Sequence, residues 1–168
     1  MSPFHCAKRS GPAVQIRETD TYYEITNDPT GVRVPKPAAT LPAVEAVPAP
    51  IQGVRLADGR WTARGPNRLS VQATAVTGFT VRWIERGPLK TVVEVTYRFD
   101  RPRYAYGAEE IAPAGPGYYR STITVQAGQP SILCAEDTDM DWSYSLDWYD
   151  AVEGDRLRAG RPGLSSWA

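Results

Sequence analysis

The sequence predicts an all-β protein folded as an antiparallel β-sandwich, and three observations lead to this fold class. Runs rich in Val, Ile, Thr, Tyr and Trp recur along the chain with turn residues between them, which is typical of antiparallel sheets. No stretch shows the 3.6-residue apolar period of an amphipathic helix. The third observation is the stretch at residues 83–99, WIERGPLKTVVEVTYRF, in which a Gly-Pro pair separates two strand-like runs.

Two hairpins are expected in the first 65 residues. The runs YYEIT and VRVPK flank the loop NDPTG, which ends on Gly31 and suits a hairpin with a five-residue loop. The runs IQGVRL and WTARG are joined through Asp58-Gly59, a dipeptide that favours tight hairpin turns. Between the hairpins, residues 36–50 are rich in Pro and Ala. We expect them to form an extended connector over the surface.

A long strand with one dry and one wet face is expected after the Gly87-Pro88 break. Before the break, the run RLSVQATAV leads into FTVRWIE, where alternation places Val81 and Trp83 on one face and Arg82 on the other. After the break, alternation gives the strand an apolar face made of Val93, Val95, Tyr97 and Phe99.

Another hairpin is expected near the C-terminal end of the sandwich. Residues 100–117 lack a period and are expected to form a loop in which Tyr104 and Tyr106 are displayed. The following strand alternates Tyr119, Ser121, Ile123 and Val125 with polar residues, and the turn Ala127-Gly128-Gln129-Pro130 leads into its partner.

Composition places the chain among ordinary globular proteins of one domain. The 168 residues can bury a core of their own, and 19 basic residues balance 19 acidic ones. This balance provides no general attraction for nucleic acid. No apolar run reaches the roughly 18 residues that a membrane helix needs. We expect a loose leader over residues 1–14, a β-sandwich over residues 15–155 and a loose tail over residues 156–168.

The cysteines and the single histidine indicate no familiar catalytic or metal motif. Cys6 and Cys134 show no CxxC or CxxH spacing, so neither a zinc site nor a disulfide framework is expected, although a single bridge remains open. Cys134 lies in the apolar run SILCA and is expected to be a small buried hydrophobic residue. His5 lies in the leader, so no nucleophile paired with histidine is expected. The leader also lacks the apolar core of a secretory signal.

Residues 136–155 concentrate charge, with eight acidic residues and no basic one. Asp137, Asp139 and Asp141 alternate, so on an extended strand their carboxylates would share one face and could bind calcium or another hard cation. An EF-hand spacing would require Gly at position 142, which is Trp. The alternative is a solvated acidic edge that discourages pairing between sheets.

The same segment carries aromatic residues beside its carboxylates. Sugar rings stack on aromatic faces while acids accept hydrogen bonds from sugar hydroxyls, so this combination suggests a carbohydrate site. The candidate substrate-binding residues are Trp142, Tyr144, Trp148, Tyr149 and Glu136. The alternative is that these aromatic residues belong to the core.

The stretch at residues 83–99, followed by YYRSTITVQAGQPSILCAEDTDMDW, resembles the galactose-mutarotase-like β-supersandwich modules of bacterial polysaccharide lyases and glycoside hydrolases, including exo-rhamnogalacturonan lyase-like proteins. The residues that fit the pattern are Glu85, Gly87, Pro88 and Leu89, then Ala127, Gly128, Gln129 and Pro130. The resemblance implies that such a module continues into further strands and often a helical toroid, so we expect this chain to be a fragment. It also implies a secreted or periplasmic location for a full-length protein, and no catalytic residue is carried over.

Three functions follow as expectations. The first is a noncatalytic module that supports or binds polysaccharide within a carbohydrate-active protein. The second is a fragment of a lyase or hydrolase in which Glu136, Asp139 or Asp141 acts on a glycan. The third is a structural sandwich whose open sheet edges pair with missing domains of a larger chain or with a second copy.

Overall fold

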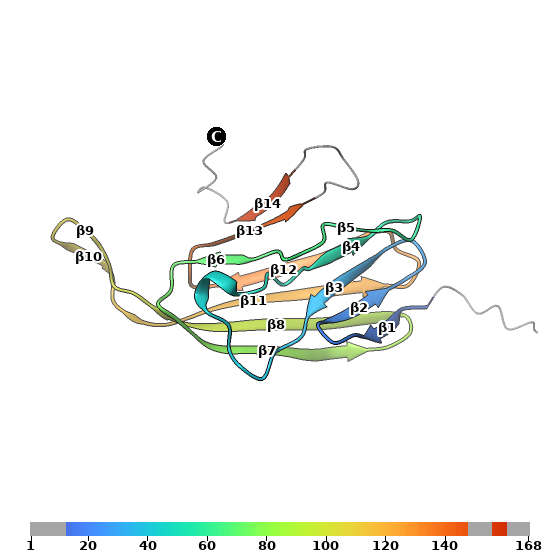
Figure 1. Cartoon of the computed structure of the whole chain (residues 1–168), viewed down its shortest axis with the longest axis horizontal. Helices are drawn as coiled ribbons and strands as arrows, with labels where there is room; N and C mark the ends of the chain where they lie inside the picture. The colour runs from blue at the N-terminus through green and yellow to red at the C-terminus, as the bar shows by residue number, and fades with distance from the viewer. Residues whose placement is uncertain (1–12, 148–155, 161–168) are drawn as a thin grey trace, which may run out of the picture.

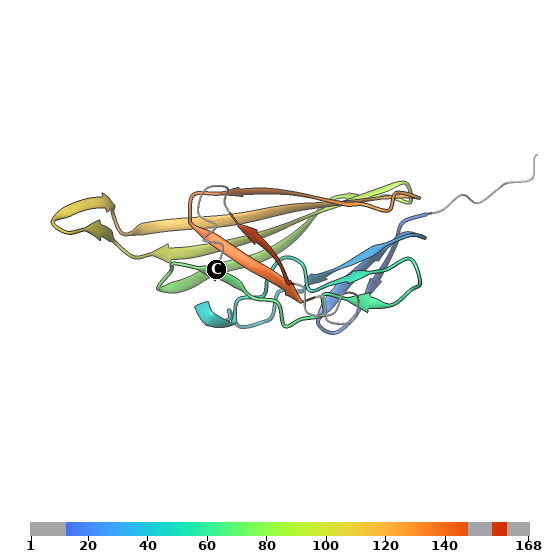
Figure 2. The same cartoon turned by 90° about the horizontal axis from the view of Figure 1, so that it is seen from above.

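The computed structural model describes residues 13–147 and 156–160, and it confirms an all-β, antiparallel, sandwich-like fold. Two sheets form the main layers, and Figure 2 shows them stacked one above the other. A short third sheet and a projecting hairpin belong to the same described fold (Figure 1). The leader expected over residues 1–14 lies outside the described residues except for its last two.

The first layer is a five-stranded sheet in sequence order. Its strands are β1 (Gln15–Glu18), β2 (Tyr22–Thr26), β3 (Gly31–Pro35), β4 (Gly53–Arg55) and β5 (Trp61–Thr62). Both expected hairpins are present, β2–β3 and β4–β5. Gly59 adopts a φ of 87° in the second turn, a conformation that glycine reaches without steric cost.

The second layer is a four-stranded sheet with the order β12-β11-β8-β7. Its strands are β7 (Ala75–Arg86), β8 (Lys90–Arg101), β11 (Gly115–Gln126) and β12 (Ile132–Thr138). The Gly87-Pro88 break is the β7–β8 turn, in which the Gly87 N–H donates to the Lys90 carbonyl at 3.0 Å. Gly128 turns the chain between β11 and β12 with a φ of 70°.

The core lies between the facing surfaces of these two sheets. The apolar face predicted for β8 is fully buried, as are Ile25, Val32 and Val34 from the first sheet. Polar side chains also join the layers. The Tyr97 hydroxyl donates to the Pro48 carbonyl at 2.7 Å, and Asn27 Nδ2 donates to the Gln129 carbonyl at 2.8 Å.

The Pro- and Ala-rich connector lies on the surface over residues 37–46, as expected, but its last residues enter the core. It contains a short 3₁₀ helix, η1 (Val44–Ala46), and Val47 and Ala49 just after it are fully buried. The Leu69 N–H donates to the Val47 carbonyl at 2.9 Å. Prolines exclude a regular ladder, but the apolar residues between them can still face the core, and here they do.

The run at residues 68–76 is divided between two sheets. Its first part is β6 (Leu69–Val71), which pairs with the distant β13 (Trp142–Asp147), whereas its last residues begin β7. The expected tail also differs in its first five residues, because β14 (Arg156–Gly160) pairs with β13. Both pairings join segments far apart in sequence, which local patterns do not indicate.

The loop expected over residues 100–117 contains a small hairpin. Its strands are β9 (Tyr104–Tyr106) and β10 (Glu109–Ala112), with Gly107 turning the chain at a φ of 62°. The hairpin projects beyond the end of the four-stranded sheet (Figures 1 and 2). Tyr104 is 51% exposed, as expected for a displayed residue.

Candidate functional site

The outer face of the five-stranded sheet carries a hollow of about 370 Å³. One register row crosses all five strands on this face: Gln15, Thr26, Gly31, Arg55 and Trp61. Gly31, in the middle of the row, is buried against the side chains of Thr26 and Arg55. Apart from Gly31, this row lines the hollow together with Ala13, Ile16, Arg17, Glu24, Asn27 and Asp28.

Gly31 has a steric reason to remain a glycine. A Cβ atom at this position would lie 2.7 Å from Thr26 Cγ2 and 3.0 Å from the Ile25 carbonyl oxygen. Both separations are shorter than the van der Waals contact of about 3.5–4.0 Å that carbon atoms prefer. The Thr26 side chain therefore already occupies the space that a side chain at position 31 would need.

Arg33 contacts both the Trp61 ring and the Glu24 carboxylate on this face. The Arg33 guanidinium lies 4.2 Å from the centroid of the Trp61 ring, within the range of a cation–π contact. Its Nε and Nη2 atoms lie 2.9 and 2.8 Å from Glu24 Oε1. One guanidinium therefore orients both an aromatic surface and a hydrogen-bond acceptor.

Two further arginines bring positive charge to the hollow. Arg17 Nε lies 3.8 Å from Glu24 Oε2, and the Arg17 side chain is 78% exposed. Arg55 Nη1 donates to the Asn27 carbonyl at 3.3 Å, and within the described ranges no carboxylate forms an ion pair with Arg55. Both guanidinium groups therefore keep donors for a bound molecule.

The carboxylate of Glu136, a predicted substrate-binding group, lies in a polar cluster on the inner side of β12. The Tyr119 hydroxyl donates to Glu136 Oε2, and the Ser121 hydroxyl donates to Oε1 at 3.0 Å. Burial raises the pKa of Glu136 above its usual value, while the two donated hydrogen bonds oppose that shift. Glu136 lines neither hollow described here.

The three aspartates predicted to bind calcium do not share one strand face. Strand β12 ends at Thr138, so Asp137 lies on the strand while Asp139 and Asp141 follow it. Asp137 accepts hydrogen bonds from Arg120 and from the Tyr118 hydroxyl, and Asp139 accepts one from the Tyr118 N–H at 2.7 Å. In the part of the chain that the structure describes, no group of three or more His, Cys, Asp or Glu side chains is placed to hold a metal ion.

Of the four aromatic residues predicted to bind substrate, the structure describes Trp142 and Tyr144. The rings of Trp142 and Tyr144 are stacked with centroids 5.7 Å apart, and Trp142 also lies 4.9 Å from the ring of Tyr119. Tyr144 is buried and Trp142 is half-buried, so both pack on the core, the alternative raised by the sequence. Trp148 and Tyr149 lie outside the described residues.

Cys134 is exposed rather than buried. The prediction of a buried residue is therefore wrong, although Cys134 pairs in register with the fully buried Ile123. The difference arises because β12 is the edge strand of its sheet, and an edge position is covered on fewer sides.

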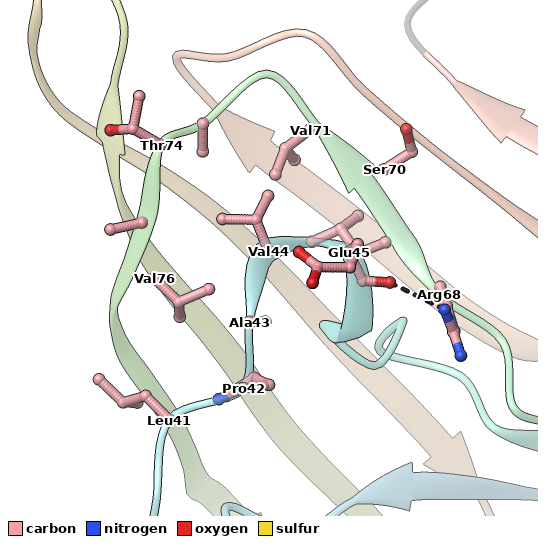
Figure 3. A pocket seen from close by; sticks show the side chains of 13 residues that line it. Leu41, Pro42, Ala43, Val44, Glu45, Arg68, Ser70, Val71, Thr74 and Val76 are labelled. Carbon is pink, nitrogen blue, oxygen red and sulfur yellow. Dashed lines mark hydrogen bonds between the residues drawn. The ribbon is translucent and has the colours of Figure 1, made fainter.

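A second, larger hollow of about 840 Å³ lies between η1, β6 and the start of β7 (Figure 3). Its lining combines apolar side chains, including Leu41, Val44, Val71 and Val76, with polar ones such as Glu45 and Ser70. Arg68 stands at one end and donates from Nη1 to the Glu45 carbonyl at 3.1 Å.

The sequence does not predict that Trp61, Glu24 and Arg55 lie together at one site. Alternation does assign Glu24 and Thr26 to one face of β2, and the Asp58-Gly59 turn does position Trp61 on a strand. The missing information was the register across five strands, which brings these side chains together with Arg55.

No family model, curated protein or solved structure matches this chain. The functional argument therefore depends on the geometry of the site. Among the described residues, no helix has the length and apolar character needed to span a membrane.

Proposed function

We propose that the protein is a noncatalytic β-sandwich module that binds polysaccharide through the hollow on the outer face of β1–β5. The observation that carries this proposal is the grouping of Trp61, Arg33 and Glu24 on one face of the sheet, where Trp61 and Glu24 line the hollow. The hollow, at about 370 Å³, falls within the roughly 300–1,000 Å³ range of small-molecule sites.

The chemistry of the lining suits a sugar. An indole ring offers an apolar face on which the C–H groups of a pyranose can stack. Around it, Arg17, Arg55 and Gln15 supply donors, and Glu24 and Asp28 supply acceptors. A sugar ring has hydroxyls along its edge that can satisfy these groups while its face covers the indole.

Preorganisation also supports binding at this face. Trp61 and Glu24 are both held by Arg33, so little side-chain entropy remains to be lost when a ligand binds. The hollow is supported by a sheet rather than by a mobile loop, and the register that builds it is fixed by two hairpins.

A glycan array followed by titration calorimetry with the best oligosaccharide tests the proposal. Trp61→Ala is expected to weaken binding about tenfold, which corresponds to about 1.4 kcal/mol of lost stacking. Trp142→Phe preserves an aromatic ring against Tyr119 and serves as the matched control, with unchanged affinity expected. If affinity followed Trp142 and not Trp61, the hollow would not be the binding site. Turnover of the bound glycan would contradict the noncatalytic assignment.

A further inference from the structure

The β9–β10 hairpin, hereafter the arm (residues 104–112), is not paired with any other strand of the described fold. Within the described fold its two strands form a separate sheet of their own, and the arm extends away from the sandwich (Figures 1 and 2). An isolated two-stranded hairpin is at best marginally stable in water. The arm therefore lacks the packing that normally supports such an element.

The arm also exposes apolar side chains. Tyr104 is 51% exposed and Ile111 is 54% exposed. The register steps from Glu110 paired with Ala105 to Ala112 paired with Tyr104, so Ile111 is the additional residue of a bulge. Bulges redirect a side chain and terminate regular pairing, and this one presents an isoleucine to solvent.

The hollow in Figure 3, hereafter the groove, combines apolar side chains with polar ones such as Glu45 and Ser70. It has a volume of about 840 Å³ and is lined by Leu41, Val44, Val71 and Val76 among others. Leu41 is itself 45% exposed. Exposed apolar surface of this kind commonly marks an interaction site.

The arm and the groove lie next to each other along the chain's fold. Thr74 lines the groove, and its N–H donates to the Asp100 carbonyl at 2.8 Å. Asp100 is the penultimate residue of β8, and the arm begins three residues after this strand ends. A two-fold axis near this end would bring each arm to the groove of the other copy, as a closed, isologous interface requires.

Charge favours the same arrangement. Arg68 stands at the end of the groove with the Glu45 carbonyl as its hydrogen-bond acceptor, and Glu109 is exposed on the arm. Within residues 13–147 and 156–160, no ion pair is formed by either side chain. An arm seated in the groove would give each of these charges a partner of opposite sign.

We propose that two copies of this chain form a two-fold symmetric dimer in which the arm of each copy occupies the groove of the other. Tyr104 and Ile111 fill the apolar part of the groove, and Glu109 pairs with Arg68 of the second copy. This arrangement accounts together for the unsupported hairpin and for the exposed apolar side chains of the groove.

Sedimentation velocity and light scattering over a micromolar concentration series test the dimer. Arg68→Glu and Glu109→Arg should each raise the dimer dissociation constant about tenfold or more, because like charges would then meet. The double variant Arg68→Glu/Glu109→Arg restores opposite charges and should return the constant to within about threefold of the original. Tyr104→Ser/Ile111→Ser should give a monomer.

Leu133→Ser is the control, because Leu133 is 58% exposed on β12, away from the arm and the groove. It should leave the dimer unchanged, and circular dichroism should show the same β signature for every variant. A chain that stays monomeric throughout the series would overturn the proposal. A dimer that survives both the charge reversals and the arm substitutions would also overturn it, since another surface would then form the interface.

Discussion

The hydroxyl of Tyr119 donates a hydrogen bond to the Glu136 carboxylate on the inner side of the β11–β12 pair. Tyr119 is fully buried and its ring packs on Tyr97 and Trp142, so the carboxylate meets its donor at the margin of the core. Glu136, whose pKa is raised, is therefore held in a defined position beside the core.

The free energy of unfolding is expected to fall less with rising pH in Glu136→Gln than in the original protein. Burial raises the pKa of Glu136 in the folded state, so its contribution is fully present below the unfolded pKa of about 4.3 and is lost as pH rises through the folded pKa. Glutamine remains neutral and removes this term. Urea unfolding at a series of pH values measures it, and the glutamine variant should gain stability relative to the original as pH rises above about 4.3.

The other titratable side chains that face Glu136 are Tyr97, Tyr119, Tyr144 and Cys134. Burial raises the pKa of the three tyrosines, and a cysteine thiol titrates well above the acidic range in any case, so all four groups remain neutral there. A stability difference between the two proteins that did not change with pH would show that Glu136 has an ordinary pKa.

Tyr97→Phe is expected to lower the free energy of unfolding by about 1–2 kcal/mol, because the half-buried Pro48 carbonyl would lose its donor. The Tyr97 hydroxyl reaches this carbonyl at 2.7 Å, and the phenyl ring would keep its stacking on Phe79 at 4.8 Å. Tyr118→Phe is the control, since its hydroxyl bonds an exposed Asp137 carboxylate. Chemical denaturation measures both, and equal effects would show that the Pro48 contact contributes nothing beyond a surface hydrogen bond.

Local signals in the sequence predicted the hairpins and the strand faces. Asp58-Gly59 positions a tight turn because glycine tolerates the φ of 87° found there. The alternation from Val93 to Phe99 predicted the buried face of β8 because successive side chains of a strand point to opposite sides. These features depend on residues adjacent in sequence, so a single sequence contains them.

Long-range pairing determined what the sequence did not predict. The sequence pattern places Leu69–Val71 at the start of one long run, yet this segment pairs with the strand that begins at Trp142. The candidate site also depends on long-range pairing. Trp61 belongs to it because Arg33 and Glu24, two strands or more away, lie beside it in the sheet. Register between distant segments is set by tertiary packing, and one sequence offers no direct measure of it.

Gly31→Ala is expected to lower the free energy of unfolding by about 1–3 kcal/mol, the usual cost of forcing an extra carbon into a tightly packed place. Its Cβ would lie 2.7 Å from Thr26 Cγ2 and 3.0 Å from the Ile25 carbonyl oxygen. Adding Thr26→Ser removes the first clash and should recover part of the loss. Gly115→Ala is the matched control, since a Cβ there meets no atom within 4 Å, and its effect should stay within about 0.5 kcal/mol. Equal costs at the two glycines would show that β2 and β3 can separate freely at Gly31.

Asp137→Asn should make the protein less sensitive to acid, the opposite direction from Glu136→Gln. Hydrogen bonds from Arg120 and Tyr118 hold the pKa of Asp137 below its usual value. The stability that it contributes is therefore present above the unfolded pKa of about 3.9 and lost as pH falls through the folded pKa. Asparagine lacks the charge at every pH, so the variant should be the less stable protein at neutral pH and should approach the original as the medium becomes acidic.

The dependence on salt distinguishes a loss of charge interactions in Asp137→Asn from a change in packing. Asp137 and Arg120 belong to a row of charges across the outer face of the four-stranded sheet, which continues through Glu94 to Arg82. Exposed ion pairs weaken as ionic strength rises, so the difference between Asp137→Asn and the original should shrink in molar salt. Thermal unfolding at neutral pH with and without salt measures it. A difference that salt leaves unchanged would mean that the aspartate acts through the neutral hydrogen bond from Tyr118 rather than through its charge.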